Sequence, residues 1–266
     1  MRQNLHTHST FCDGKDTIEE MVQTAIEKEF DILGFSGHGH LAIDSSSMQD
    51  TQGYINEVLR IKQKYKDSIS VYLGIEQDML ERIQDKTPFD YVIGSKHFLE
   101  QIPIDYSKEV FEQLLNSYNN DIYRMCKDYY KDLSNMANWD EVDIIGHIDL
   151  ISKYNEDQSY FSFEDPKYFN PVCNCVDRLL ETDKIFEVNT GAIARGYRKS
   201  PYPYKNLLTY LYEKKARILL NSDCHNRNDL DCAFMESLEL IKRCGFKEMQ
   251  ILTPNGFQPL EIAFFK

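Results

Sequence analysis

Short apolar runs alternate with segments of helical periodicity along the whole chain. The apolar runs predict seven strands, over residues 2–5, 32–36, 70–74, 91–95, 142–146, 184–188 and 217–221. The segments between them predict helices over residues 17–28, 54–66, 108–136, 171–182, 203–214 and 229–244. Strands that alternate with helices of this length are typical of βα units, which build a parallel sheet.

Details of the pattern refine this picture at both ends of the chain. The first helix follows Asp16, a suitable N-cap, and repeats apolar Ile18, Met21 and Val22 at helical spacing. A late run at 248–252 predicts either an eighth strand or a flanking segment. The acidic, tyrosine-rich stretch from Leu99 to Tyr130 indicates an elaboration of the fold or a lid.

The length suits one α/β barrel. The chain has 266 residues, and barrels of alternating strands and helices commonly need about 250. We therefore predict a single barrel domain over residues 1–266, with the active site at the C-terminal ends of the strands. A hydrophobic content of 42% is sufficient for a core, so a bound metal would serve chemistry and not the stability of a small fold.

Charge and cysteine content exclude several classes of protein. The net charge of -13 argues against nucleic-acid binding, which needs clustered Lys and Arg to neutralise phosphates. Seven cysteines without C-x-x-C pairs indicate reduced thiols. Residues 1–5 carry no apolar signal segment, and no stretch approaches the roughly 18 apolar residues of a membrane span. We expect a cytoplasmic protein without a membrane partner, and its oligomeric state stays open.

All seven histidines follow predicted strands. They are His6, His8, His38, His40, His97, His147 and His225. In a parallel barrel, the residues that follow each strand meet at the C-terminal mouth, where barrel enzymes hold their active sites. Because imidazole is the commonest protein ligand for transition metals, this pattern predicts a metalloenzyme.

Two segments carry paired donors at the same spacing. His6 and His8 lie one residue apart in an extended segment, so their rings point to the same side. Asp13 follows beside a glycine, in a turn that can fold back over the mouth. Asp223 and His225 repeat this spacing after the last predicted strand, with a carboxylate in place of one imidazole. Both segments are suited to holding a metal ion.

Single donors follow the other strands. The glycine-rich loop after the second strand exposes His38 and His40, and spacing does not decide which of them is a ligand. Glu76 can bridge two cations, since each carboxylate oxygen can coordinate separately. His97 and His147 stand at equivalent positions after later strands. A catalytic zinc takes three protein ligands, so the set implies two or three metals. Adjacent divalent cations are the usual catalyst for phosphoester hydrolysis.

Taken in order, the motifs resemble the polymerase and histidinol phosphatase (PHP) family. They are H-T-H-S-T-F-C-D-G, G-F-S-G-H-G-H, G-I-E, G-S-K-H-F, G-H-I-D-L, E-V-N-T-G and N-S-D-C-H, which together span residues 6–225. The resemblance implies a distorted (β/α)7 TIM-like barrel and a centre of three divalent ions. Zinc, iron and manganese all suit mixed nitrogen and oxygen ligands.

The resemblance also implies which residues bind each metal. The nine ligands would be His6, His8, Asp13, His38, Glu76, His97, His147, Asp223 and His225. By this likeness, His6, His8, Glu76 and Asp223 hold one metal. Glu76 is shared with a second metal, held also by His97 and His147, and Asp13, His38 and His225 hold the third. His40 becomes a non-ligand at the pocket edge, free to contact phosphate or shuttle a proton.

Within the family, the chain is most similar to the stand-alone histidinol-phosphatases of histidine biosynthesis. The string I-I-G-H-I-D-L-I-S-K-Y and the Arg195-Gly196-Tyr197-Arg198 segment carry this likeness. It implies hydrolysis of L-histidinol phosphate, a small phosphorylated metabolite. Arg195 and Arg198 are the candidate phosphate-binding residues, because guanidinium presents a planar fork. Lys96 is a further candidate, although this residue and Gly37 depart from the residues usual in the family.

The implied mechanism is attack on phosphorus by a hydroxide that bridges two metals. Glu76, Asp223 and His40 are the candidate catalytic residues, with Asp223 or a neighbouring histidine protonating the leaving alkoxide. Three rival interpretations stay open: a phosphodiesterase or nuclease, a protein tyrosine phosphatase, and a metal-binding module without turnover. The sequence offers no basic groove for a polynucleotide, and it retains all nine ligand types.

Overall fold

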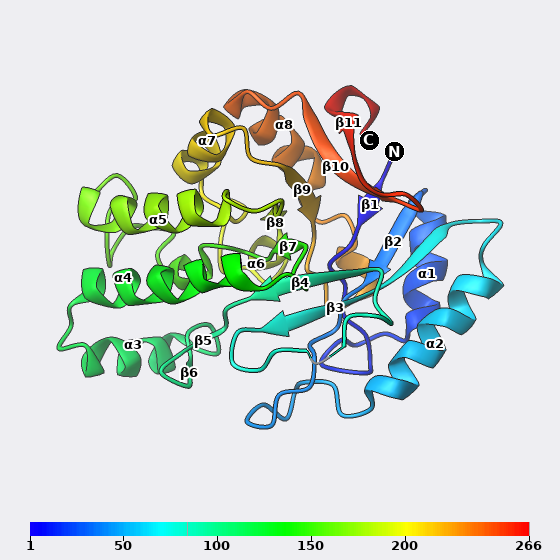
Figure 1. The fold of residues 1–266 in the computed structure, drawn as a ribbon, viewed down its shortest axis with the longest axis horizontal. Coiled ribbons are helices and arrows are strands. Elements are labelled where there is room, and N and C mark those ends of the chain that lie inside the picture. The colour runs from blue at the N-terminus through cyan, green and yellow to red at the C-terminus, as the bar shows by residue number, and fades with distance from the viewer. Residues whose placement is uncertain (84, 266) are drawn as a thin grey trace.

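Seven parallel strands form a nearly closed barrel in the computed structural model, which describes residues 1–83 and 85–265. In sheet order the strands are β1 (Gln3–Asn4), β2 (Ile32–Phe35), β3 (Ser70–Asp78), β4 (Tyr91–Ser95), β7 (Ile144–Ile145), β8 (Ile185–Asn189) and β9 (Ile218–Asn221). Every neighbouring pair is parallel. All seven strands coincide with predicted ones, and the barrel prediction is confirmed (Figure 1).

The barrel closes between its first and last strands just beyond their C-terminal ends. A parallel bridge pairs Thr7 with Cys224, and the His8 amide donates to the Cys224 carbonyl at 3.0 Å. Below this bridge, the Leu5 amide donates to the Asn221 side chain at 2.8 Å. The closure therefore brings the segment of His6 and His8 beside the segment that follows β9.

Helices cover the outside of the barrel (Figure 1). They are α1 (Ile18–Glu27), α2 (Thr51–Lys64), α3 (Lys108–Ser117), α4 (Ile122–Leu133), α5 (Pro166–Leu179), α6 (Gly191–Ala194), α7 (Lys205–Glu213) and α8 (Phe234–Cys244). Short 3-10 turns lie at Ser134–Asn138, Leu150–Ser152, Arg227–Asp229 and Ile262–Phe264. The N-cap of α1 is Thr17 and not the predicted Asp16, because Thr17 and Glu20 form a reciprocal capping box.

The predicted helix at 108–136 is divided in two. α3 ends at Ser117 and α4 begins at Ile122, and the connection places Asn119 and Asn120 in the left-handed region, at φ of 55° and 60°. Asparagine tolerates this conformation better than most residues. The same stretch begins with the antiparallel hairpin of β5 (Phe98–Leu99) and β6 (Ile102–Pro103), which lies at the mouth of the barrel.

The barrel interior is a small apolar core with residues from six of the barrel strands, from Leu5 directly after β1, and from the late segment 251–252. Its buried members are Leu5, Ile32, Tyr72, Tyr91, Ile93, Ile144, Ile185, Leu219, Ile251 and Leu252. The Tyr91 hydroxyl crosses the interior and donates to the Leu5 carbonyl at 2.5 Å. Gly74 leaves the room for this ring, since a Cβ atom there would lie 2.3 Å from Tyr91 Cζ.

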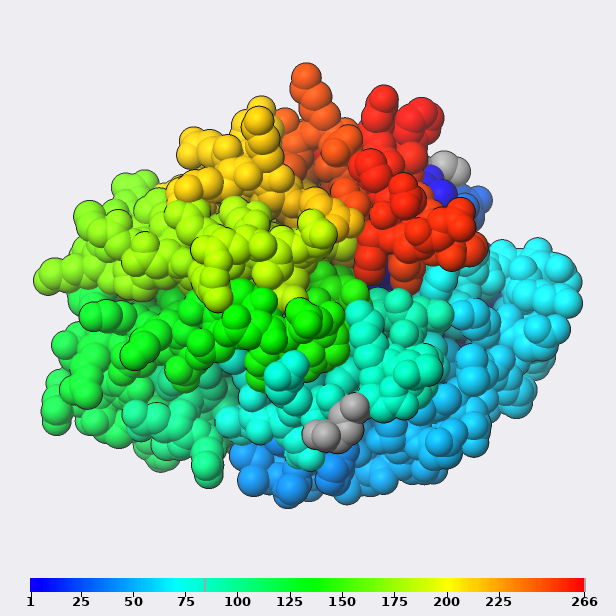
Figure 2. All heavy atoms as spheres, in the orientation of Figure 1, coloured from blue at the N-terminus to red at the C-terminus, as the bar shows by residue number. Residues whose placement is uncertain are grey.

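An antiparallel hairpin closes the N-terminal end of the barrel. β10 (Glu248–Thr253) pairs with β11 (Gly256–Glu261) and contributes two residues to the interior core. The run predicted at 248–252 is thus a strand outside the barrel sheet. Figures 1 and 2 show the two ends of the chain side by side, where the Met1 amino group donates to the Phe264 carbonyl at 2.6 Å. None of the helices in the described part of the chain has the length and apolarity that a bilayer span requires.

Candidate metal centre

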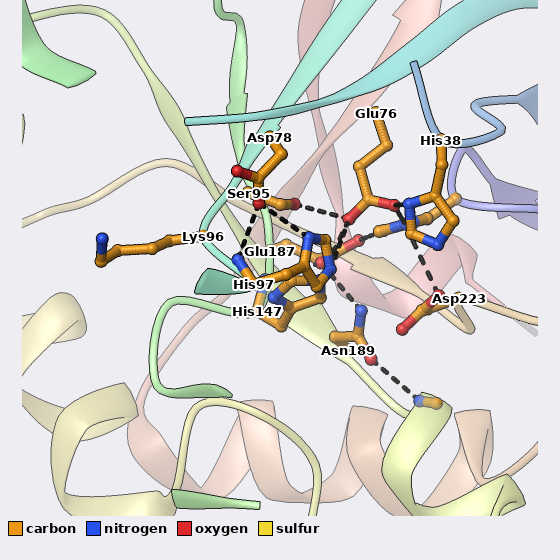
Figure 3. A network of polar contacts seen from close by, with 12 residues as sticks. His38, Glu76, Asp78, Ser95, Lys96, His97, His147, Glu187, Asn189 and Asp223 are labelled. Carbon is orange, nitrogen blue, oxygen red and sulfur yellow. Dashed lines mark hydrogen bonds and ion pairs between the residues drawn. The ribbon is translucent and has the colours of Figure 1, made fainter. Parts of the chain in front are cut away.

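Histidines that follow four of the barrel strands, β1, β2, β4 and β7, converge on the Glu76 carboxylate at the C-terminal mouth (Figure 3). Glu76 lies within β3, which runs four residues beyond its predicted end, and is 1% exposed. A bridge between His38 and Glu76 extends the pairing of β2 with β3 to this level. The parallel strands therefore deliver their terminal side chains to one place, as the sequence pattern predicts.

The deepest group of donors lies around one oxygen of Glu76. Glu76 Oε2 is 3.3 Å from His6 Nε2 and 3.6 Å from His8 Nε2. Asp223 Oδ1 closes the group, at 3.6 Å from His6 Nε2 and 3.2 Å from His8 Nε2. Both imidazoles are fully buried. Two nitrogen and two oxygen atoms at these separations could hold one divalent ion.

A second group lies around the other oxygen of Glu76. Glu76 Oε1 is 3.1 Å from His147 Nε2 and 3.5 Å from His97 Nε2. Ser95 donates its hydroxyl to this oxygen at 2.6 Å. One carboxylate is thereby shared between two donor groups, as the resemblance implies.

A third group lies nearer to solvent, around Asp13. Asp13 Oδ2 is 3.1 Å from His225 Nε2 and 3.7 Å from His38 Nε2, and Asp13 Oδ1 is 3.4 Å from His8 Nδ1. The other ring nitrogen of His38 lies 2.9 Å from Glu76 Oε2. His38 and His8 therefore connect the third group to the first. All nine predicted ligands lie in these three groups.

The chemistry of these donors fits divalent cations. Among the described residues, His6 Nε2, His8 Nε2 and Glu76 Oε2 are buried atoms that make no hydrogen bond of normal geometry, although each lies within 3.3 Å of another donor atom of the centre. All three belong to the deepest group. A buried polar atom left without a partner costs about 1–3 kcal/mol. A cation between them would satisfy all three atoms at once, and an apolar or hydrogen-bonded packing would not leave them convergent.

Electrostatics at the centre favour bound positive charge. Burial by itself lowers the pKa of His6, but the carboxylates of Glu187, Glu76 and Asp223 raise it well above its ordinary value. Burial likewise opposes the ionised form of Glu76, yet the surrounding histidines hold its pKa well below the usual range. The pKa of His225 is lowered to about 4 by burial and by His8. Glu76 is therefore ionised at neutral pH, and a bound cation can replace the proton on His6.

Asp223 joins the metal centre to Arg195. Its Oδ1 atom faces His6 and His8, while its Oδ2 accepts from Arg195 Nη2 at 3.0 Å. Arg195 Nη1 lies 3.1 Å from the Asp223 carbonyl and 3.2 Å from His225 Nδ1. Asp223 has φ of 50°, in the left-handed region that non-glycine residues rarely adopt. This turn directly after β9 aims the carboxylate into the mouth.

Glu187 in β8 is a functional candidate that the sequence interpretation missed. Its Oε1 lies 2.7 Å from His6 Nδ1 and accepts from Asn221 Nδ2 at 2.8 Å. Its Oε2 accepts from the His147 amide and from Asn189 Nδ2, both at 2.9 Å. A carboxylate on Nδ1 directs the Nε2 lone pair of His6 toward the cluster. The signal was available as a lone carboxylate inside the buried strand IFEVN.

A cavity of about 840 Å³ opens in front of the cluster. Arg195 lines it, as predicted. Lys153 and Asp105, which the sequence interpretation did not select, line it as well. Lys153 is buried in the cavity wall, where its ammonium donates to the Asp105 carbonyl at 2.6 Å. Among the described lining residues outside the metal groups, Arg195 and Lys153 carry cationic side chains.

Three predicted site residues lie outside the part of the cavity lining that the described residues form. His40 is exposed, with Nδ1 at 3.2 Å from the Met48 carbonyl. Lys96 points away from the cluster (Figure 3), toward Asp132 at 3.3 Å. The Arg198 guanidinium is buried against the Tyr202 ring and donates to Ser152 at 2.6 Å. None of these three side chains lines the cavity, so their role as phosphate contacts stays a prediction.

Comparison with known proteins identifies relatives over most of the chain. The family model described as PHP domain matches residues 4–191. A Schizosaccharomyces pombe protein named "Probable histidinol-phosphatase" is 26% identical over 94% of this chain and 90% of its own length. Histidinol-phosphatase of Bacillus subtilis is 24% identical over 90% of this chain and 98% of its own.

A solved structure shares the fold. The histidinol phosphate phosphatase of Lactococcus lactis, complexed with zinc, L-histidinol and phosphate, superposes with a TM-score of 0.77. The match covers 97% of this chain and 98% of that one, at 19% sequence identity. The likeness shows that the two chains adopt the same barrel.

Proposed function

This chain belongs to the PHP family, and on that basis we propose that it is a metal-dependent phosphomonoesterase that hydrolyses L-histidinol phosphate to L-histidinol and phosphate. The observation that carries the proposal is the convergence of nine residues with nitrogen or oxygen donors, Glu76 and Asp13 among them, at the mouth of the barrel. Relatives named histidinol-phosphatase match nearly the full length of the chain. The whole chain then acts as one barrel domain.

The proposed cofactors are three divalent ions, of zinc, iron or manganese. The deepest would be held by His6, His8, Glu76 and Asp223, the second by Glu76, His97 and His147, and the third by Asp13, His38 and His225. The orphaned buried atoms of the deepest group support this assignment. When bound, adjacent divalent ions lower the pKa of a shared water and neutralise charge on phosphate oxygens.

Arg195 and Lys153 would bind the substrate phosphate. Both line the cavity, and the Arg195 guanidinium is already oriented by Asp223 and by His225. Guanidinium suits phosphate because its planar fork can donate two parallel hydrogen bonds. Binding by these two cations would hold the phosphorus against the mouth and turn the ester oxygen toward the open side of the cavity.

Asp223 would hold a metal ion and would not donate a proton. Burial opposes its ionisation, but Arg195 and His6 hold the pKa of Asp223 well below its ordinary value. Both of its oxygens already face positive or hydrogen-bonding groups. A carboxylate in this environment stays ionised at neutral pH, which makes it a poor general acid.

Phosphate release from L-histidinol phosphate tests the proposal directly. We expect steady turnover by protein supplied with Mn²⁺ or Zn²⁺, and little turnover of phosphotyrosine peptides or phosphodiesters. Glu76→Gln removes one charge from two donor groups, so its loss of kcat/KM and metal content should exceed the roughly 10- to 100-fold typical of outer-shell partners. Glu27→Gln on the exposed side of α1 is the matched control. Turnover and metal content near those of the wild type in Glu76→Gln would contradict the proposal.

A further inference from the structure

The cavity has a wall that the metal centre and its phosphate site do not use. It is formed by Pro103 at the end of β6 and by the segment that leads from β6 to α3, where Asp105 and Tyr106 line the cavity. The Tyr106 side chain is 77% exposed, although it is large and aromatic. An exposed aromatic at the rim of a polar cavity is suited to covering part of a bound molecule.

The main chain of this segment is fixed, and the Asp105 carboxylate is not. The Asp105 carbonyl accepts from Lys153 Nζ at 2.6 Å and from the Tyr154 hydroxyl at 2.9 Å. Lys153 Nζ also lies 4.4 Å from the centre of the Tyr197 ring. By contrast, the carboxylate reaches Lys153 only through Oδ2, at 3.4 Å. In the part of the chain that the structure describes, Asp105 Oδ1 makes no hydrogen bond or ion pair, which leaves it available to a ligand.

The Asp105 carboxylate lines the same cavity as Arg195, and its Oδ2 atom lies 3.4 Å from the Lys153 ammonium. Burial would raise its pKa, but His97, Lys153 and His147 hold the pKa of Asp105 below its ordinary value. It is therefore an anion close to the place where a phosphate ester would bind. An anion there disfavours a phosphate ester, and a substrate that brings its own positive charge next to the anion offsets this repulsion.

We infer that Asp105 binds the ammonium group of the substrate, with Tyr106 covering the adjacent organic group, so that the cavity selects phosphate esters of 2-amino alcohols over esters without an amine. The inference rests on the proposed function and deepens it. In L-histidinol phosphate the ammonium lies on the carbon next to the ester methylene, so a carboxylate near the phosphate site can reach it. The single negative charge of Asp105 then favours the substrate with an ammonium group and disfavours phosphate esters that lack it.

Asp105→Asn tests the inference, because it keeps the shape and removes the charge. The readout is the ratio of kcat/KM for L-histidinol phosphate to kcat/KM for 3-(imidazol-4-yl)propyl phosphate, which lacks the amine. We expect this ratio to fall roughly 10- to 100-fold, the effect of losing one charge-assisted hydrogen bond. Asp44→Asn is the matched control, since Asp44 also lines the cavity but is held by Ser46. Its ratio should stay at the wild-type value.

Inhibition by the products gives a second measurement. The inhibition constant of L-histidinol should be higher for Asp105→Asn than for the wild type, by a factor similar to the fall of the ratio. The inhibition constant of inorganic phosphate should not be higher for the variant. An equal loss of kcat/KM for both esters would overturn the inference, since it would indicate that Asp105 only positions Lys153. An equal fall of the ratio in Asp44→Asn would overturn it too, as an effect of overall charge.

The two proposals fail in different ways. If the wild-type protein hydrolyses L-histidinol phosphate and Asp105→Asn keeps the wild-type ratio, only the role of Asp105 is refuted. If the metal-loaded wild-type protein hydrolyses neither ester, the proposed function is refuted and the inference with it.

Discussion

Replacing Glu187 by glutamine should lower both the free energy of unfolding and the affinity of the centre for metal ions. The carboxylate is fully buried and receives four donors, from His6, His147, Asn189 and Asn221. Two of them reach each oxygen. A glutamine amide has one oxygen and one NH₂ group, so two of the four donors would face another donor in either orientation of the amide.

The structure gives the size of this effect. Two hydrogen bonds to a charged acceptor are lost, at about 1.5–3 kcal/mol each. Removing a buried charge relieves part of its desolvation, so the lower bound of about 3 kcal/mol is the expected loss in the free energy of unfolding. His6 also loses the carboxylate that directs its Nε2 atom, and outer-shell partners of this kind typically change metal affinity by roughly 10- to 100-fold.

Two assays check the prediction separately. Urea unfolding of metal-free Glu187→Gln and wild-type protein measures the stability term, and titration with Zn²⁺ against a competing chelator measures the affinity. The control is Glu181→Gln. Glu181 lies just after α5 and forms an exposed ion pair with Arg178, so this variant should match the wild type in stability and in metal affinity. Wild-type stability together with wild-type metal affinity in Glu187→Gln would refute the reasoning that Glu187 orients His6.

Four further predictions follow from the same contacts. Gly74→Ala should lower the free energy of unfolding by about 1–3 kcal/mol, because the new Cβ meets the Tyr91 ring; urea unfolding at wild-type values would contradict this. Arg195→Lys should lower kcat/KM for L-histidinol phosphate by roughly 10- to 100-fold, since lysine lacks the fork that Arg195 presents; unchanged kinetics would remove Arg195 from the site. His40→Ala should keep kcat/KM within about twofold of the wild type, as expected for a surface change, and a large loss would return His40 to the site. Metal binding to the metal-free protein at pH 7 should release protons, and the metal affinity should increase as pH rises, because the pKa of His6 in the metal-free protein is raised. Calorimetry in buffers of different ionisation enthalpy measures the release, and its absence would contradict this prediction.

The sequence pattern predicted the barrel well because buried parallel strands consist of continuous apolar runs. The strand predicted at 91–95 is observed as Tyr91–Ser95, buried throughout. The pattern failed to predict strand residues that are polar and nevertheless buried. β3 continues through Glu76, Gln77 and Asp78, all of them polar and all buried. Their burial depends on β4, which pairs with them from a segment more than ten residues away along the chain.

The place where these donors gather was also predictable, since histidines and carboxylates that follow parallel strands must meet at one end of a barrel. The choice of nine ligands came from the resemblance to the family. Residues that act through these ligands were not predictable. Glu187 looks like one polar residue in an apolar strand until His6, Asn189 and Asn221 are placed around it.

The sequence by itself determined the order of strands and helices, the rim on which the ligands meet and the types of atom available there. Only the tertiary structure decided which cation faces the cavity. Arg195 and Lys153 line it, while Arg198 and Lys96 pack against aromatic rings away from it. The physical reason is that hydrophobic periodicity records which face of an element is buried, whereas a long side chain in a loop takes the direction that its neighbours in space allow.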